Sequence, residues 1–196
     1  MSLASHVVSQ TDKAETHKRI VKIAAKRLRE NGLAGVGIAE LMKEAGLTVG
    51  GFYKHFDSRD DLVIEALGSA FGGWQRRIDA AASGGTPLSY ESLIDDYLNE
   101  AHRDNPATGC ALGALAGEIA RGDKRVRALA SEQIRNGIQL LAGLLRSKDK
   151  RTARSKAILT LSALVGAVAL ARAVSDDALS LEILKTVSKL LKDPAA

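Results

Sequence analysis

The stretch that decides the fold of this chain is Gly46-Leu47-Thr48-Val49-Gly50-Gly51-Phe52-Tyr53-Lys54-His55-Phe56. Aromatic, imidazole and ammonium groups are crowded into its last five residues. Side chains one or two positions apart on a helix lie on different faces, so a short helix can bury Phe52 or Phe56 while the three residues between them point outward. This arrangement is typical of a helix that contacts an anionic partner.

The residues before this stretch predict a helix-turn-helix. Ile38-Ala39-Glu40-Leu41-Met42-Lys43-Glu44-Ala45 has apolar residues at positions 38, 41, 42 and 45, which places one apolar stripe on a short helix. Gly46 can end that helix in the left-handed conformation, and Thr48 can cap the next one. Two short helices joined by a glycine-containing turn form the DNA-binding arrangement in which the second helix enters the major groove. An ordinary helical hairpin has the same spacing, so the spacing alone leaves both interpretations open.

A longer signature in the same region resembles the N-terminal DNA-binding signature of the TetR family of bacterial repressors. It reads Gly46-Leu47-Thr48-x-Gly50-x-x-Tyr53-x-His55-Phe56-x-Ser58-Arg59-x-x-Leu62, and the similarity extends over about residues 20–67. One position departs from the family, because Gly37 stands where members usually carry Ser or Thr at the start of the second helix. A glycine can still cap there, but it lacks the hydroxyl that contacts phosphate in the family.

The resemblance implies an all-α fold of about nine helices. A three-helix helix-turn-helix domain over residues 12–58 would be joined to an antiparallel helical domain for ligand binding and dimerisation over residues 59–196. The implied function is a ligand-responsive transcriptional repressor, which binds a palindromic operator in double-stranded DNA as a homodimer and is released by a small-molecule effector. A constitutive architectural DNA-binding dimer without an effector is the main alternative.

The same resemblance implies a set of DNA contacts. Thr48, Tyr53, Lys54 and His55 would touch phosphates, Val49, Gly51 and Phe52 would face base edges, and Arg59 would belong to the same surface. The chemistry agrees, because hydroxyl and ammonium donors near a helix N-terminus suit a phosphate. Since Gly50 and Gly51 carry no side chains, readout would rest on apolar contacts with thymine methyl groups and on DNA shape.

The composition fits one or two compact helical domains with a modest basic excess. Of the 196 residues, 45% are hydrophobic and 26% are charged, which is enough to build a buried core. The net charge is +5, and the excess is denser in residues 1–60, where 10 Lys and Arg face 7 Asp and Glu. A basic excess around the helix-turn-helix favours phosphate binding.

Cysteine usage and hydropathy indicate a cytoplasmic protein without a membrane partner. The single cysteine excludes a disulfide framework within the chain, and Met1 to Thr11 contains no apolar segment of a secretory signal and is expected to be a frayed arm. The uncharged run from Ala157 to Ala171 is shorter than the roughly 20 residues of a spanning helix, so it predicts a buried helix. The four histidines lack metal-ligand spacing and no catalytic grouping is apparent, so no enzyme, metal or cofactor is expected.

Periodicity and capping residues predict the remaining helices. A first helix would begin at Asp12 and end at Asn31-Gly32, and a Ser58-Arg59-Asp60-Asp61 capping box would open a fourth helix that extends to about Ala82. Further helices are predicted at about 90–102, 110–120 and 123–145, and two long ones at about 152–174 and 177–192. The apolar character of the last pair predicts a partner. In the family these two helices form a four-helix dimer bundle, which here would involve Leu161, Leu164, Val168, Ile183 and Val187.

Five residues are candidates for the effector site. Phe71, Trp74, Tyr90 and Tyr97 fall on the helices that enclose the ligand pocket in the family, although the same side chains can be plain core. Cys110 is predicted in the first turn of a helix, where the helix dipole favours a thiolate. Similar Gly-Cys pairs occur in TetR-type regulators of electrophile stress. Cys110 is therefore either a sensing thiol or a small buried hydrophobe.

Overall fold

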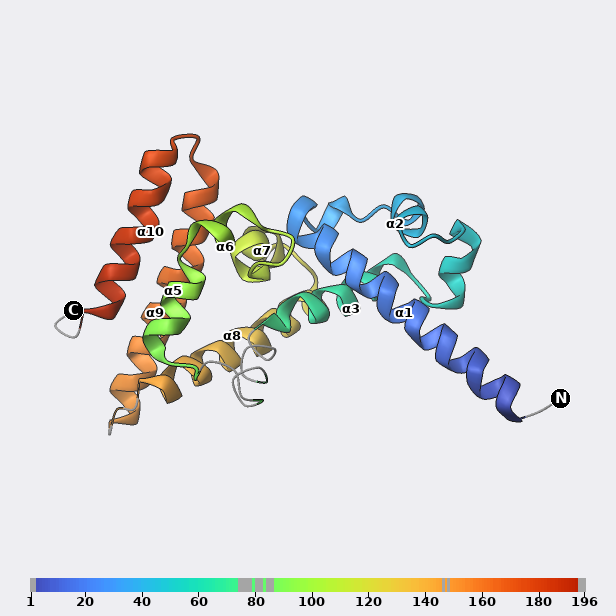
Figure 1. Ribbon diagram of the computed structural model, residues 1–196, viewed down its shortest axis with the longest axis horizontal. Helices are drawn as coiled ribbons and strands as arrows, with labels where there is room; N and C mark the ends of the chain where they lie inside the picture. The colour runs from blue at the N-terminus through green and yellow to red at the C-terminus, as the bar shows by residue number, and fades with distance from the viewer. Residues whose placement is uncertain are drawn as a thin grey trace.

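All regular structure in the described part of the chain is helical (Figure 1), as the sequence predicts. The computed structural model describes residues 3–73, 79, 83, 87–145, 147 and 149–193, without the side chains of residues 3–11. The elements are α1 (Leu3–Asn31), η1 (Leu33–Gly35), α2 (Ile38–Glu44), η2 (Val49–Lys54), α3 (Arg59–Phe71), α5 (Tyr90–Tyr97), α6 (Glu100–Asp104), α7 (Ala111–Ala120), α8 (Lys124–Leu144), α9 (Lys150–Ala173) and α10 (Asp177–Lys192), where η denotes a 3₁₀ helix.

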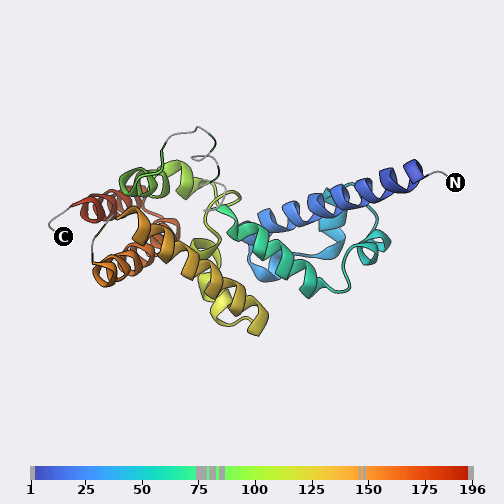
Figure 2. The same cartoon turned by 90° about the horizontal axis from the view of Figure 1, so that it is seen from below.

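The helices form two lobes. Figures 1 and 2 show α1, α2, η2 and α3 at one end of the molecule and the antiparallel pair α9 and α10 at the other, with α7 and α8 between them. One hydrophobic core fills the first lobe, and it also contains Leu112, Leu115 and Ile119 of α7. A second core joins α5, α8, α9 and α10. The first core thus crosses the predicted domain boundary at residue 58, and that boundary stays a prediction.

Three element boundaries differ from the predictions. The helical backbone of α1 begins at Leu3, so the expected arm over residues 1–11 is mostly helix. The predicted helix at 90–102 is two helices, because Leu98 leaves helical geometry and the Asn99 side chain accepts a hydrogen bond from the His102 backbone N–H, which starts α6. The predicted fourth helix ends at Phe71 as α3, and most of residues 74–82 lie outside the described residues.

Side-chain caps hold the starts of α3 and α8, and the cap at Ser58 was predicted. The Ser58 hydroxyl oxygen accepts a hydrogen bond from the Asp61 N–H at 3.1 Å, and the Asp123 carboxylate accepts one from the Val126 N–H at 2.9 Å. Thr48 differs, because it occupies the N-cap position of η2 with extended backbone but makes no side-chain cap within the described residues. Its hydroxyl is therefore left for another partner.

The turn between α2 and η2 is fixed by a Schellman motif. Gly46 has φ +71°, its N–H donates to the Lys43 carbonyl at 3.0 Å, and the Leu47 N–H donates to the Met42 carbonyl at 2.8 Å. These two bonds satisfy carbonyls that the end of α2 leaves unpaired, and glycine adopts the left-handed conformation without steric cost. The turn sets the direction in which η2 leaves α2.

Replacing Gly46 with Ala should destabilise the protein by about 1–2 kcal/mol, because a Cβ is strained at positive φ. Gly37→Ala is the matched control, since Gly37 has φ −79° and a Cβ there meets nothing within 4 Å. Its unfolding free energy should change by less than about 1 kcal/mol. Urea denaturation measures both variants. Equal losses for the two would contradict the left-handed turn.

Candidate functional site

The outer face of η2 and its flanks carries the predicted DNA contacts that the structure leaves accessible. Val49 is 49% exposed and Tyr53 is 68% exposed, and Thr48, Gly50 and Lys54 are also exposed. An apolar side chain, a hydroxyl, a phenol and an ammonium group thus share one short element that is held on the first lobe. Hydroxyl, phenol and ammonium groups donate hydrogen bonds to phosphate, and an apolar side chain can contact a thymine methyl group.

Phe52 is not on that face, so its predicted role in base contact is wrong. It is 0% exposed, and its ring centroid lies 5.3 Å from that of Phe56 and 5.2 Å from that of Tyr53. Among residues 49–54, all of which the structure describes, only Phe52 is buried. With glycines at 50 and 51, η2 needs this large side chain as its anchor, because aromatic burial contributes most to the packing of a short helix.

Arg59 was predicted to belong to the DNA-contacting surface, and that role stays a prediction, because two nitrogens of its guanidinium bond inside the first lobe. The Nε–H donates to the Val36 carbonyl at 3.0 Å, and Nη2 donates to the Leu33 carbonyl at 2.7 Å. Both carbonyls belong to the turn between α1 and α2. An arginine that satisfies two backbone carbonyls stabilises the turn that leads into the helix-turn-helix.

His55 is half-buried between η2 and α1. Its Nδ1 is enclosed without a hydrogen-bond partner among the described residues, and its ring centroid lies 5.9 Å from that of His17. Burial lowers the pKa of His55, and the nearby His17, Lys13 and Lys54 lower it further. The imidazole is therefore neutral near pH 7. The positive charge of this face then comes from lysines.

A groove of about 570 Å³ runs between α1 and η2 and is lined by Asp12, Lys13, Thr16, Tyr53, Lys54 and His55. The sequence did not single out Lys13 and Thr16. The sequence feature that could have identified them is their spacing of three residues, which places both side chains on one side of a helix. Their proximity to Tyr53 depends on how α1 packs over η2. The groove brings two lysines, two hydroxyls and an imidazole together, which is suitable chemistry for a DNA backbone.

A second cavity lies beside α5, α6 and the start of α7, and the end of α3 also lines it. Its volume is about 500 Å³, and it is lined in part by Phe71, Tyr97, His102, Thr108, Cys110 and Gln133. Three of the five predicted effector residues, Phe71, Tyr97 and Cys110, therefore meet in one cavity. Trp74 lies outside the described residues.

Tyr90 does not line this cavity, so the structure does not bring it together with the other predicted effector residues. It is 6% exposed in the second core, and its hydroxyl lies 2.7 Å from the Thr160 hydroxyl of α9. A buried phenol requires a hydrogen-bond partner, and Thr160 supplies it. Tyr90 is a structural residue that joins α5 to α9.

The Cys110 thiol lies in a polar corner of the cavity. Cys110 is the N-cap residue of α7 rather than part of its first turn. Its backbone N–H donates to His102 Nε2 at 2.9 Å, so Nε2 carries no proton and His102 Nδ1 donates to the Tyr97 carbonyl at 2.6 Å. Burial raises the pKa of the Tyr97 hydroxyl well above its usual value, and the adjacent Cys110 raises it further. Tyr97 therefore presents a protonated phenol beside the thiol.

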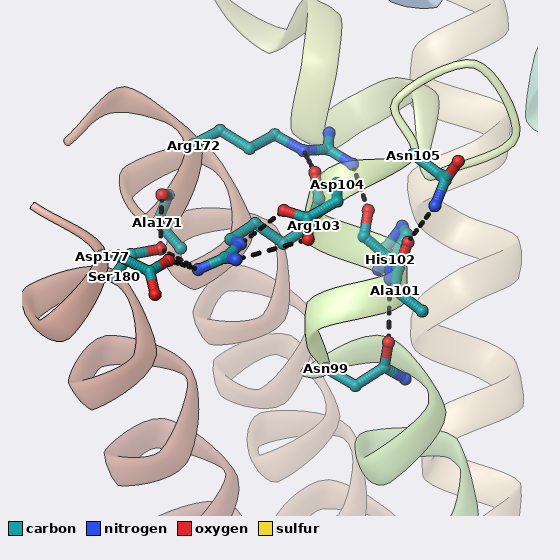
Figure 3. Close-up of polar contacts among 10 residues, drawn as sticks. All are labelled: Asn99, Ala101, His102, Arg103, Asp104, Asn105, Ala171, Arg172, Asp177 and Ser180. Carbon is teal, nitrogen blue, oxygen red and sulfur yellow. Dashed lines mark hydrogen bonds and ion pairs between the residues drawn. The ribbon is translucent and has the colours of Figure 1, made fainter. Parts of the chain in front are cut away.

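Hydrogen bonds join α6, which forms one wall of the cavity, to the end of α9 and the start of α10 (Figure 3). The Arg172 Nε–H donates to the Arg103 carbonyl at 2.9 Å, and its Nη2 donates to the His102 carbonyl at 2.6 Å. Arg103 in turn reaches Asp177 at 2.7 Å and the Ser180 hydroxyl at 3.0 Å. These contacts connect the cavity wall to the two helices that were predicted to dimerise.

The predicted dimerisation residues on α9 lie inside the protomer, so that assignment is wrong for them. Leu161, Leu164 and Val168 are buried in the second core, because they face α5, α8 and α10. Ile183 and Val187 of α10 are half-buried against the same core. Large apolar side chains are exposed at other positions of the two helices, namely Ile158, Leu159, Leu170, Leu179 and Leu190.

Two other features of the described residues bear on the function class. By length and composition α9 could cross a membrane, but its inner face packs on α8 and α10 and contributes Ala157, Leu164 and Ala171 to the core. No three His, Cys, Asp or Glu side chains within the described residues come together as metal ligands.

Comparisons with known proteins agree with this geometry. Residues 20–66 match the family described as bacterial regulatory proteins, tetR family, and residues 89–188 match the C-terminal domain of LmrA/YxaF-like transcriptional regulators. The repressor NemR of Escherichia coli K12 is 21% identical over 136 residues, which cover 68% of each chain. The repressor KstR of Mycolicibacterium smegmatis is 31% identical over 93 residues, which cover 47% of this chain and 46% of KstR.

Solved structures show the same fold. A TetR-family regulator from Cytophaga hutchinsonii superposes with a TM-score of 0.75 at 21% identity and covers 92% of this chain and 94% of its own. The reduced form of E. coli NemR has a TM-score of 0.72 at 19% identity and covers 91% and 95%. The helix-turn-helix, the two-lobed helical architecture and both family matches lead to one conclusion: the chain belongs to the TetR family of bacterial transcriptional regulators, which are DNA-binding proteins and not enzymes.

Proposed function

We propose that this regulator is a repressor that binds a palindromic operator as a homodimer and is released when a small molecule enters the second cavity. The observation that carries the proposal is the cavity of about 500 Å³ lined by Phe71, Tyr97 and Cys110. Ligand sites in proteins are concave, mostly apolar and provided with a few convergent polar groups, and this cavity fits that description. An architectural DNA-binding protein without an effector does not require such a cavity, so the cavity favours the ligand-responsive function.

The effector that fits this cavity is a small, mainly apolar molecule. Phe71 and several alanines supply the apolar lining, and the Tyr97 phenol and the Gln133 amide supply polar groups. The Cys110 thiol adds a nucleophile, which favours a second candidate function, the sensing of electrophiles. Both functions use one cavity and require the same link between cavity and operator.

Blocking the cavity at Cys110 tests this link. Alkylation of Cys110, the only cysteine in the chain, with N-ethylmaleimide should weaken operator binding by about tenfold, because the added group fills the cavity. Cys110→Ser should bind the operator as the unmodified protein does and should not respond to the reagent. The operator is first selected from random duplexes, and affinities are measured by fluorescence anisotropy. Full alkylation without loss of affinity would contradict the proposed function.

In the proposed complex Lys54, Tyr53 and Thr48 hold phosphates and Val49 faces the bases. Phosphate contacts release condensed counterions, so Lys54→Ala should lower the slope of log affinity against log salt by about one unit and weaken binding to all duplexes alike. Tyr53→Phe removes only a neutral donor and should cost about 1 kcal/mol with little change in slope. Salt titrations on operator and scrambled duplexes measure both effects.

Val49→Ala is the matched variant for base contact. It should leave the salt slope unchanged and relax the sequence preference at one symmetric pair of operator positions, because a two-fold dimer reads two half-sites. If Lys54→Ala changed the sequence preference and Val49→Ala changed only the salt slope, the proposed docking of η2 would be contradicted.

The proposed dimer uses the exposed faces of α9 and α10. Leu159 and Leu170 of α9 are 64% and 59% exposed and lie eleven residues apart, which is three helical turns and therefore one side of the helix. Leu179 and Leu190 of α10 have the same spacing and are also exposed. Exposed apolar side chains aligned on two adjacent helices indicate an interface between protein chains.

Leu159→Glu and Leu170→Glu should each convert the dimer to a monomer and abolish operator binding, because a buried unpaired carboxylate opposes association. Ile134→Glu is the matched control, since Ile134 is an exposed apolar residue of α8, which is not one of the two helices proposed to form the interface. It should stay dimeric in sedimentation velocity. Dimers that survive both leucine substitutions would rule out this interface.

A further inference from the structure

One side chain of α7, the helix that lies between the two lobes, reaches the turn that precedes the helix-turn-helix. The Glu118 Oε2 atom, near the end of α7, accepts a hydrogen bond from the Leu33 backbone N–H at 2.7 Å, and 85 residues separate the two in sequence. Leu33 begins η1, the turn that connects α1 to α2. The acceptor is a partly buried carboxylate, and hydrogen bonds to charged groups are stronger than those between neutral groups.

The turn is held from two sides. Glu118 accepts from the Leu33 N–H, while Arg59 of α3 donates to the Leu33 and Val36 carbonyls. The backbone approaches Glu118 so closely that a Cβ on Gly32, which has φ +79°, would lie 2.5 Å from the carboxylate oxygen. Only a glycine suits that position. The positive φ of Gly32 thus accompanies a close approach of the turn to the Glu118 carboxylate.

The opposite end of α7 lines the second cavity, which is the proposed effector site. Cys110 and Ala111 line the cavity, and the carbonyl of Ala107, just before α7, accepts a hydrogen bond from Arg29 of α1 at 2.6 Å. Between its ends α7 packs Leu115 into the core of the first lobe. A helix of ten residues moves as a rigid element, so a displacement at the cavity end changes the position of Glu118.

We propose that Glu118 is a positioning residue that couples the cavity to the DNA-reading pair α2 and η2. With the cavity empty, its carboxylate fixes η1 and so the start of α2. An occupant that shifts α7 withdraws the carboxylate and frees the turn. The inference rests on the proposed function and adds to it the contact through which the two lobes communicate.

Another polar contact between the lobes provides a control. Arg125 of α8 pairs with Asp61 of α3 at 2.8 Å, but the Arg125 side chain is 52% exposed. Exposed ion pairs are screened by water and salt, so this pair contributes little free energy to any coupling between the lobes. Arg125→Ala therefore removes another polar contact of a carboxylate, the ion pair with Asp61, without touching η1.

The test measures operator affinity before and after alkylation of Cys110 with N-ethylmaleimide in four proteins. In the unmodified sequence and in Arg125→Ala, alkylation should weaken binding by about tenfold. Glu118→Ala should bind before alkylation as weakly as the alkylated parent and change less than about twofold on alkylation, because the coupling contact is already absent. Glu118→Gln should recover most of the response, since its amide oxygen can accept from the Leu33 N–H.

Amide hydrogen exchange at Leu33 gives a local readout, and Glu118→Ala should exchange there about tenfold faster than Arg125→Ala. If Glu118→Ala does not fold, Glu118→Asp carries the same expectations, because its shorter side chain cannot reach the turn. An alkylation effect that is equal in the parent and the Glu118 variant overturns the role of Glu118 alone. An unmodified sequence that does not respond to alkylation overturns the proposed function, and the inference with it.

Discussion

The packing of Phe52 against Phe56 holds η2 on the first lobe, and the DNA-reading surface depends on this contact. Two glycines precede Phe52, so the segment has little else with which to attach itself. Phe52 points inward, whereas Val49, Tyr53 and Lys54 are exposed. A 3₁₀ helix of six residues has few internal hydrogen bonds, so burial of the Phe52 ring is needed to stabilise its conformation.

The Schellman turn at Gly46 and the turn at residues 33–35 determine how α2 and η2 are placed in the first lobe. The first sets the direction of η2 relative to α2, and the second sets the position of α2 relative to α1 and α3. Arg59 of α3 and Glu118 of α7 satisfy backbone groups of the second turn. The first hydrophobic core extends into α7, so the lobe that contacts DNA is not packed independently of the lobe that contains the cavity.

Local patterns in the sequence predicted the helices and several caps, because spacing and capping chemistry are local properties. The turn at Gly46 and the caps at Ser58 and Asp123 follow from residues only a few positions apart. The direction of individual side chains was harder to predict. Phe52 and the inward residues of α9, such as Leu164, were assigned to outer surfaces from the family resemblance, whereas both are buried. A resemblance gives the role of a helix, but not which of its apolar side chains this protomer buries in its own core.

The long-range contacts that individual side chains make could not be predicted from sequence. Glu118 and Arg59 bond backbone groups 85 and 26 residues away, and Tyr90 bonds Thr160 at a separation of 70. No local pattern distinguishes such side chains from solvated ones. Cys110 was placed near a helix start by the preceding Pro and Gly, but its proximity to Tyr97 and His102 depends on the break between α5 and α6.

The central claim is that cavity and operator are thermodynamically linked. The most direct measurement is the affinity of a compound that releases the operator, determined by calorimetry with and without saturating operator duplex. Linkage requires that the operator weaken compound binding by the same factor by which the compound weakens operator binding, and we expect a factor of about five or more. Compound binding that is unchanged by the operator would contradict the account.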